Sequence, residues 1–275
     1  MQTEYKECKL LNHGFISLVD TMGNDAAIVQ AARVSYGEGT KTINEDKGLI
    51  NYLMKHKHTS PFEMCEIKLH IKAPMFVARQ WLRHRTANVN EISARYSIVR
   101  EEYYIPDLEN IDGQSSTNKQ CRGGGLSEES KLYAQRGIKS ACENSYGEYE
   151  ALLYSKLGVE SGIAREIARG VLPMNMYTEW YWKIDLHNLF HFISLRIHPH
   201  AQYEIRVYAE KLAEIVKQWC PMAYEAFIEH KVEAVTLSKS QKEALKKLLN
   251  GIDIQGENLS KRELEELKLT FNNNN

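Results

Sequence analysis

The segment Arg83–Arg95 concentrates residue types that bind anions and polar rings. An arginine side chain is planar and permanently charged, and it binds phosphate through two parallel hydrogen bonds. A lone glutamate among arginines is held ionised, and it can accept hydrogen bonds from a ribose hydroxyl or a base N–H. The segment therefore predicts a surface for an anionic ligand that carries a polar ring. It reads Arg83-His84-Arg85-Thr86-Ala87-Asn88-Val89-Asn90-Glu91-Ile92-Ser93-Ala94-Arg95.

Two other interpretations of this segment stay open on composition alone. A solvated basic loop, or a set of structural salt bridges, would use the same residues. Contact with RNA or DNA is also possible, with Tyr96, Tyr103 and Tyr104 stacking on bases. The net charge of −1 counts against nucleic acid as a partner, because the electrostatic footprint of the chain is small.

The segment Asp185–Arg196 places more chemistry-bearing side chains on a predicted helix, which Asp185 would cap. His187 and His191 are one turn apart, whereas Arg196 projects nearly opposite them on an ideal helix. One pocket would hardly collect these three side chains, so we expect two pockets, or one pocket shared between subunits. Packing into the core is the alternative role for the two histidines.

The cysteines are expected to be structural. They are odd in number and lack CxxC spacing, which argues against a disulfide framework and a zinc site and favours the reducing cytoplasm. Cys65 and Cys220 are expected to be small buried core residues. His56 and His58 have no further close ligands, so no metal site is expected. The five cysteines are Cys8, Cys65, Cys121, Cys142 and Cys220.

The elements that position these side chains are predicted by pattern. Cys65–Lys72 alternates apolar and polar residues, which predicts a strand, and Tyr96–Ile105 is expected to be extended. The fold class is mixed α/β (α+β), with a central sheet, flanking helices and a helical C-terminal appendage. Helices are predicted over Asn24–Gly37, Glu45–Lys55, Met75–Leu82, Ser127 (as the N-cap) to about Leu157, Gly162–Leu172, from Asp185, from Pro199 to about Lys217, Ser238–Leu249 and Ser260–Leu269.

Length and composition bound the organisation of the chain. Its 275 residues, 43% hydrophobic and 26% charged, fit one large globular domain, which we assign to residues 1–235. Residues 112–127 are predicted to form a mobile polar insertion, and residues 236–275 a charged helical extension with a disordered tail. Neither a signal peptide nor an apolar run of bilayer length is found, so no membrane is expected.

The arginine-rich segment resembles the signature of the flavin-dependent thymidylate synthases (the ThyX family), Arg-His-Arg-x-x-Ser-x-Asn-Glu-x-Ser-x-Arg. Asn88 stands where the family usually has Ser. The resemblance extends over residues 14–227 outside the insertion, and includes His58–Glu63, with Ser60 in place of Thr, and Arg196–Glu204. Matches at fixed spacing are specific. They are Arg83, His84, Arg85, Asn90, Glu91, Ser93 and Arg95.

The resemblance implies a thymidylate synthase-complementing-type fold and the methylation of dUMP to dTMP. It implies FAD as cofactor, NADPH and 5,10-methylenetetrahydrofolate as co-substrates, and a homotetramer with shared active sites. Carried over residue by residue, dUMP contacts Gln80, Arg83, Glu91, Ser93, Ala94, Arg95, Arg169 and Arg196. FAD contacts His58, Ser60, Glu63, Arg83, His84, Arg85, Glu91, Asp185, His187 and His191. The family commonly has Asn or Arg at the last three of these positions.

Arg196 is implied to be the catalytic residue. Its guanidinium would lie near N3 and O4 of the uracil ring and stabilise negative charge there, in place of a cysteine nucleophile. The flavin would give the hydride, so that the folate leaves as tetrahydrofolate. Two other functions stay open on the residues: a nucleotide- or RNA-binding module without activity, and a flavoprotein that methylates another pyrimidine.

Overall fold

The structure of this protein is a computed structural model, and its described residues form two compact units. The first unit is Met1–Phe227 and the second is Ile228–Asn275. Among the described residues, no helix has the length and apolar character needed to cross a membrane. The structure describes residues 7–34, 43–116, 121–154, 162–250, 260 and 263–264.

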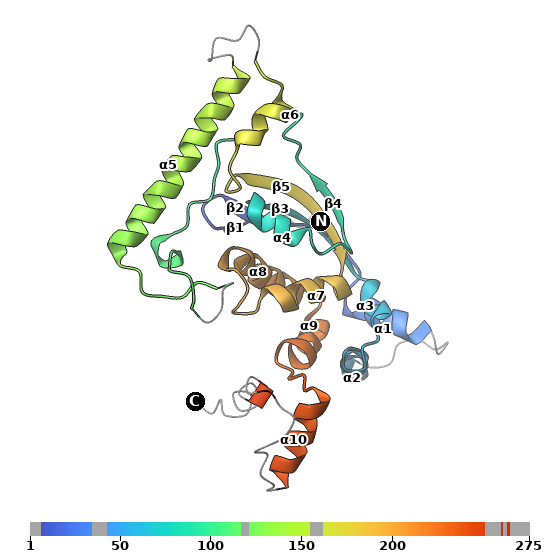
Figure 1. The fold of residues 1–275 in the computed structure, drawn as a ribbon. Helices are drawn as coiled ribbons and strands as arrows, with labels where there is room; N and C mark the ends of the chain where they lie inside the picture. Colours follow the sequence, from blue (N-terminus) through green and yellow to red (C-terminus); the bar gives the residue numbers. More distant parts are fainter. Residues whose placement is uncertain are drawn as a thin grey trace. The chain divides into compact units, whose positions relative to one another are not determined.

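A five-stranded antiparallel sheet forms the centre of the first unit, in the order β1-β2-β3-β5-β4 (Figure 1). Ile67, Leu69 and Ile71 of β3 are fully buried, which confirms the predicted alternation, although the strand continues to Pro74. The mixed α/β fold class is confirmed. The strands are β1 Cys8–Leu10, β2 Gly14–Met22, β3 Glu66–Pro74, β4 Asn88–Glu91 and β5 Tyr177–Asp185.

Helices α4, α7 and α8 cover one face of this sheet around a cluster of aromatic side chains. The indole of Trp81 on α4 is fully buried, and it lies 5.2 Å from Trp182 of β5, 4.5 Å from Phe192 of α7 and 5.8 Å from Tyr208 of α8, between ring centroids. Buried aromatic groups of this size dominate core energetics. The helices of the first unit are α1 Asp25–Val34, α2 Ile43–Lys55, α3 Ser60–Glu63, α4 Met75–Trp81, α5 Glu128–Leu153, α6 Arg165–Ala168, α7 Leu186–Arg196, α8 Tyr203–Trp219 and α9 Pro221–Phe227.

Several predicted elements differ from the observed ones. The sequence predictions contain neither β4 nor β5. The extended segment Tyr96–Ile105 is not a strand, and only Tyr103 forms an isolated bridge, with Met176. The predicted helix Gly162–Leu172 is shorter, because α6 passes into a 3₁₀ turn at Arg169–Val171 and ends there.

Two predicted helix caps are confirmed. Ser127 caps α5, and its side chain accepts a hydrogen bond from the backbone N–H of Ser130. Asp185 caps α7 through the N–H of Asn188. Such caps satisfy donors that the first turn of a helix leaves free.

The polar insertion is anchored to the first turn of α8. Arg122 pairs with Glu204, a buried carboxylate that also accepts a hydrogen bond from the hydroxyl of Tyr104 at 3.0 Å. Within the insertion, Gln114 and Arg122 form an isolated β-bridge. A buried carboxylate that pairs with a cation and a hydroxyl avoids most of the cost of desolvation.

The second unit begins with a π-helical segment, Ile228–Val232, and contains α10, Lys239–Leu249. The predicted helix Ser238–Leu249 is confirmed, and Ser238 and Gln241 form a capping box at its start. The long helix ends at Leu153 with Tyr154 as its C-cap, before its predicted end at about Leu157. Three other predicted features lie wholly or mainly outside the described residues. They are the end of the first helix after Val34, the helix Ser260–Leu269 and the tail Asn272–Asn275.

Candidate active site

A cavity of about 560 Å³ lies where the arginine-rich segment leaves the sheet, opposite α6 and the 3₁₀ turn that follows it. Four residues that the resemblance assigns to dUMP line it. Its other walls come from the end of β3, the start of β5 and residues 97–102. The four predicted residues are Glu91, Ser93, Ala94 and Arg169.

The backbone of the arginine-rich segment is fixed against β5. Glu91 ends β4 opposite Trp180, and the next residue, Ile92, donates its N–H to the carbonyl of Glu179 at 2.9 Å. The chain then turns, and the carbonyl of Ser93 accepts the N–H groups of residues 96 and 97 at 3.0 and 3.1 Å. The backbone pairing with β5 and the hydrogen bonds of this turn thus hold Glu91 and Ser93 at the cavity.

Helix α6 holds this turn from the other side. Arg165 donates a hydrogen bond to the carbonyl of Tyr96 at 2.9 Å. Glu166 lies 3.2 Å from the guanidinium of Arg95, and both side chains are about half exposed. Arg165 therefore holds α6 against this turn. Arg95 itself does not line the cavity but pairs with a residue that does.

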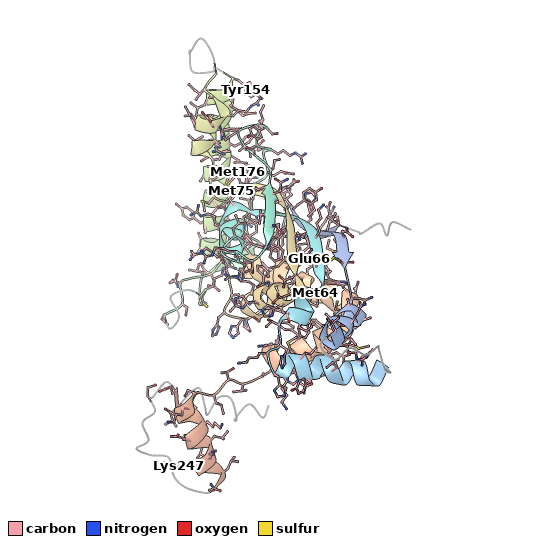
Figure 2. The ribbon with its side chains drawn as sticks, turned by 90° about the vertical axis from the view of Figure 1, so that its right-hand side faces the viewer. Met64, Glu66, Met75, Tyr154, Met176 and Lys247 are labelled. Atoms are coloured by element: carbon pink, nitrogen blue, oxygen red, sulfur yellow. The ribbon has the colours of Figure 1, made fainter. Side chains whose placement is uncertain are left out.

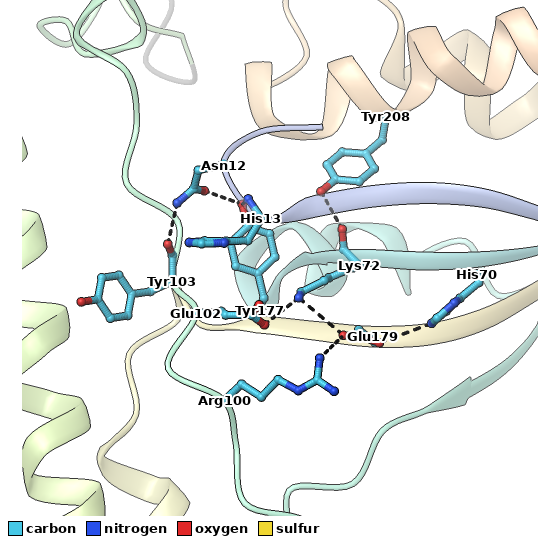
Figure 3. Close-up of polar contacts among 10 residues, drawn as sticks. All are labelled: Asn12, His13, His70, Lys72, Arg100, Glu102, Tyr103, Tyr177, Glu179 and Tyr208. Atoms are coloured by element: carbon cyan, nitrogen blue, oxygen red, sulfur yellow. Dashed lines mark hydrogen bonds and ion pairs between the residues drawn. The ribbon is translucent and has the colours of Figure 1, made fainter. Parts of the chain in front are cut away.

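A network of charged side chains forms the wall of the cavity next to β3 (Figure 3). Lys72 is only 6% exposed, and its ammonium lies 2.6 Å from Glu102 and 3.6 Å from Glu179. Glu179 also lies 3.4 Å from the imidazole of His70 and 3.8 Å from the guanidinium of Arg100. A buried cation with two carboxylate partners is compensated, so this wall presents fixed charges of both signs.

Tyrosine hydroxyl groups tie the network to neighbouring elements (Figure 3). Tyr208 of α8 donates to the backbone carbonyl of Lys72 at 2.7 Å, and Tyr177 of β5 donates to the side chain of Asn12 at 2.7 Å. Burial raises the pKa of both phenols above the ordinary value, so they remain neutral donors.

A second cluster lies at the end of α7. The guanidinium of Arg196 donates from Nε to Nε2 of His84 at 3.3 Å, and the rings of His84 and His191 lie 5.8 Å apart. Burial, followed by the charges of Arg196 and His191, lowers the pKa of His84 to about 4. His84 is therefore neutral at pH 7, with its proton on Nδ1 and an acceptor facing Arg196.

This cluster bears on one prediction about α7. His187, His191 and Arg196 were not expected in one pocket, and two of them, His191 and Arg196, lie against His84. The expectation for all three together stays a prediction. The helix geometry holds, but the long side chain of Arg196 extends to a residue that lies against α7. Burial also lowers the pKa of the Arg196 guanidinium, which stays positive at pH 7 because arginine begins above 12.

Several residues expected at FAD lie on or beside α3 and α7, and α3 and the start of α7 are at the end of β3 away from the cavity. Glu91, which is also expected at FAD, lines the cavity instead. Ser60 and Glu63 begin and end α3, which packs against α7. The ring of His58 lies 5.9 Å from that of Tyr52. The carboxylate of Asp185 accepts hydrogen bonds from both nitrogens of Asn188, so its oxygens serve the helix cap.

Figure 2 shows the separation along β3: Met64 and Glu66 lie at one end of the strand, and Met75 and Met176 at the other. Asp185 pairs with Glu66 at the first end, whereas the cavity opens near Met75. Nine residues of extended chain span roughly 25–30 Å. Within one chain, the cavity and the start of α3 are therefore far apart.

The remaining predicted residues do not line the cavity. Gln80, on α4, donates a hydrogen bond to the side chain of Gln202, just before α8. Arg83 and Arg85 are exposed after α4, on either side of His84. His187 is half-buried in the first turn of α7. In one chain, therefore, some predicted dUMP contacts line the cavity. Others, Gln80, Arg83 and Arg196, lie on α4, just after α4 and at the end of α7, which we call the α4–α7 surface.

Several residues that line the cavity were not predicted as site residues from the sequence. Lys72 falls on the polar register of its strand, which predicts solvent exposure, but the structure buries it. Thr178 is 4% exposed, and its hydroxyl donates to the carboxylate of Glu91 at 2.5 Å. The alternation of Trp180, Trp182 and Ile184 was the available signal for β5, and hence for the place of Thr178.

The cysteines behave as predicted for core residues. Cys65 and Cys220 are fully buried, and the hydrogen bond with Cys65, together with burial, raises the pKa of Cys220 far above the ordinary value. None of the described cysteines lines the cavity beside Glu91. Over the same described residues, no group of three or more His, Cys, Asp or Glu side chains is arranged to hold a metal ion.

A concave site with a buried ammonium group and paired carboxylate groups, carried on an antiparallel sheet, defines an enzyme-type pocket for a small polar ligand. Residues 17–222 match the thymidylate synthase complementing protein family. This match covers more than half of the chain, and the chain belongs to that family.

Named relatives and solved structures agree with this assignment. The flavin-dependent thymidylate synthase of Rickettsia conorii (strain ATCC VR-613 / Malish 7) is 53% identical over 276 residues, covering 97% of this chain and 94% of that protein. That of Ehrlichia ruminantium (strain Gardel) is 55% identical over 265 residues, covering 96% and 87%. The crystal structure of the UMP/dUMP methylase PolB from Streptomyces cacaoi with 5-Br dUMP superimposes with a TM-score of 0.72 at 34% identity, covering 82% of this chain and 99% of that one.

Proposed function

We propose that this chain is a flavin-dependent thymidylate synthase that methylates dUMP to dTMP. The carbon comes from 5,10-methylenetetrahydrofolate, NADPH reduces the flavin, and tetrahydrofolate is released. The observation that carries the proposal is the cavity formed by Glu91, Ser93, Ala94 and Arg169, in a chain more than 50% identical to enzymes of that name.

The nucleotide is proposed to bind across the cavity and the α4–α7 surface. Arg83, Arg95 and Arg169 supply positive charge for its phosphate, and Gln80, Ser93 and Glu91 supply hydrogen bonds for its ribose and base. Backbone amides near Ala94 add donors. Charge-assisted hydrogen bonds of this kind are about twice as strong as neutral ones.

Arg196 is proposed to activate the uracil ring. A guanidinium near N3 and O4 stabilises the negative charge that builds up when C5 becomes nucleophilic. The burial of Arg196 supports this role, because electrostatic stabilisation is larger where water is excluded. No thiolate is needed, which agrees with the burial of Cys65 and Cys220 in the core.

The residues along α3 and α7 fit a flavin. Ser60 and Glu63 on α3 and His191 on α7 are exposed, α3 packs against α7, and the ring of His84 lies next to that of His191. Arg83, Arg85, His58, Asp185 and His187 lie in the same segments. Bound FAD supplies the reducing electrons, while these side chains hold and orient it.

We further propose a homotetramer with active sites shared between subunits. In one chain, the cavity and the start of α3 lie at opposite ends of β3, and the dUMP contacts divide into two groups. A second subunit would bring one group to the other. We also propose that the enzyme works in the cytoplasm, because its five cysteines, odd in number and without CxxC spacing, suit a reducing compartment.

The proposal is tested with the purified protein by its visible spectrum and by tritium release from 5-tritiated dUMP. A yellow protein that releases tritium and forms dTMP only with methylenetetrahydrofolate and NADPH is expected. UMP serves as the competing substrate, since PolB is named for both nucleotides. A colourless protein that stays inactive with added FAD would refute the proposal, and methylation of UMP alone would change its substrate.

A further inference from the structure

We infer that Thr178 is a positioning residue for the nucleotide site and acts by fixing the carboxylate of Glu91. Its hydroxyl donates to Oε1 of Glu91 at 2.5 Å, which leaves Oε2 available to the ligand. The inference rests on the proposed function, since Glu91 has a role in catalysis only if the cavity binds the nucleotide.

The side chains of Thr178 and Glu91 differ in their freedom of movement, and this difference decides which of the two orients the other. Thr178 is 4% exposed on β5, where it pairs with Ala73 of β3, and its branched side chain has few accessible rotamers. Glu91 is exposed at the end of β4, where a long side chain would otherwise sample several rotamers. The rigid hydroxyl therefore orders the carboxylate, and the carboxylate does not order the hydroxyl.

Strand register explains why this contact forms. Glu91 lies directly opposite Trp180, so Thr178 is its diagonal neighbour, two residues along β5 and on the same face of the sheet. Diagonal neighbours in antiparallel pairs lie within reach of long side chains. The N–H of Ile92 also bonds to the carbonyl of Glu179, so β5 holds both the backbone and the side chain at this point.

The cavity is built around this contact. Thr178, its two strand neighbours Tyr177 and Glu179, and Glu91 all line it. A carboxylate with one oxygen occupied by a fixed donor can present the other oxygen to a ribose hydroxyl or a base N–H in one orientation. Pre-organisation of this kind lowers the entropy lost when the ligand binds.

The test removes the hydroxyl of Thr178 and keeps the shape of its side chain. In the holoenzyme, Thr178→Val should raise the KM for dUMP about tenfold or more, as expected for a lost hydrogen bond to a charged group, with a smaller change in kcat. Thr178→Ser keeps the hydroxyl and should restore a KM close to wild type. Thr21→Val, a hydroxyl removed from β2 of the same sheet and outside the cavity, is the matched control.

A double-substitution cycle separates positioning from a purely structural role. In a Glu91→Gln background, Thr178→Val should change the KM for dUMP much less than in the wild type, because the charged acceptor is already lost. Equal fold-changes in the two backgrounds would overturn the inference, as would an unchanged KM in Thr178→Val. If the valine variant does not fold, Thr178→Ser and Thr178→Ala differ by the hydroxyl and apply the same test.

The outcomes also separate this inference from the proposed function. A wild-type protein that forms no dTMP under any condition refutes the function. A wild-type protein that forms dTMP, with a Thr178→Val variant of equal KM and equal calorimetric affinity for dUMP, refutes only the role of Thr178.

Discussion

Replacing Arg122 by methionine should destabilise the protein, because Glu204 would keep a buried negative charge without its cation. The Glu204 side chain is 3% exposed, whereas that of Arg122 is 36% exposed. Methionine retains much of the length of the arginine stem, so the change removes charge more than packing volume. Tyr104 would be left as the hydrogen-bond donor to the carboxylate.

The size of the effect follows from the exposure of the two partners. Removing one partner of a fully buried ion pair costs about 3–5 kcal/mol in the free energy of unfolding. Water reaches Arg122, so we expect a smaller loss, of about 2 kcal/mol. For a domain of this size, that loss corresponds to a fall in Tm of roughly 4–8 °C.

A thermal-unfolding cycle measures this loss at fixed protein and FAD concentrations. The variants are Arg122→Met, Glu204→Gln and the double variant. Glutamine keeps an oxygen acceptor for Tyr104 but carries no charge, so Arg122→Met should cost less than about 0.5 kcal/mol in that background. Lys139→Met, which breaks an exposed pair with Glu143 on α5, is the control and should change Tm little.

Two results would refute the reasoning. Equal losses of Tm from Arg122→Met in the wild-type and Glu204→Gln backgrounds would mean that the arginine acts through packing alone. No loss in either background would mean that the insertion is not anchored to α8 in solution.

Three further predictions concern the site and the helix caps. His84 has a pKa of about 4 in the folded protein and about 6.5 in the unfolded chain. Between these two pH values the unfolded chain is protonated at His84 and the folded protein is not. The free energy of unfolding should therefore fall across that window, and denaturation of His84→Gln should show a smaller fall; parallel curves would contradict the assignment. Arg196→Ala should lower kcat for dTMP formation by about 10²-fold or more with an unchanged circular dichroism spectrum, and a near wild-type rate would remove Arg196 from the chemistry. Ser127→Ala should cost about 1 kcal/mol in thermal unfolding, whereas Ser127→Asp keeps the cap; equal Tm values for the two variants would argue against it.

Sequence patterns predicted those strands and helix caps that are determined by a few neighbouring residues. The alternation in β3, the cap at Ser127 and the cap at Asp185 each depend on a few neighbouring residues, and each is confirmed. β5 has an equally clear alternation, with Trp180, Trp182 and Ile184 buried, but it was not predicted as a strand. β4 is four residues long and exposed, so no burial pattern could indicate it.

The side-chain partnerships of the site could not be predicted from local pattern. Lys72 meets Glu179 because β3 pairs with β5 in one register, across more than a hundred residues of chain. The contact between Thr178 and Glu91 depends in turn on the register of β4 against β5. A shift of one residue would turn these side chains to the other face of the sheet. The resemblance named Glu91, but only the paired strands bring Thr178 to it.

The cluster at His84 bears on how a guanidinium could replace a cysteine. Arg196 uses Nε to reach His84, and this hydrogen bond exists only while His84 is neutral and offers a lone pair. The low pKa of His84 maintains that state throughout the physiological range. Both terminal nitrogens of Arg196 are then available for a bidentate contact with a planar, charge-accumulating ring. Under the proposed function, His84 therefore orients the guanidinium and keeps a competing positive charge away from it.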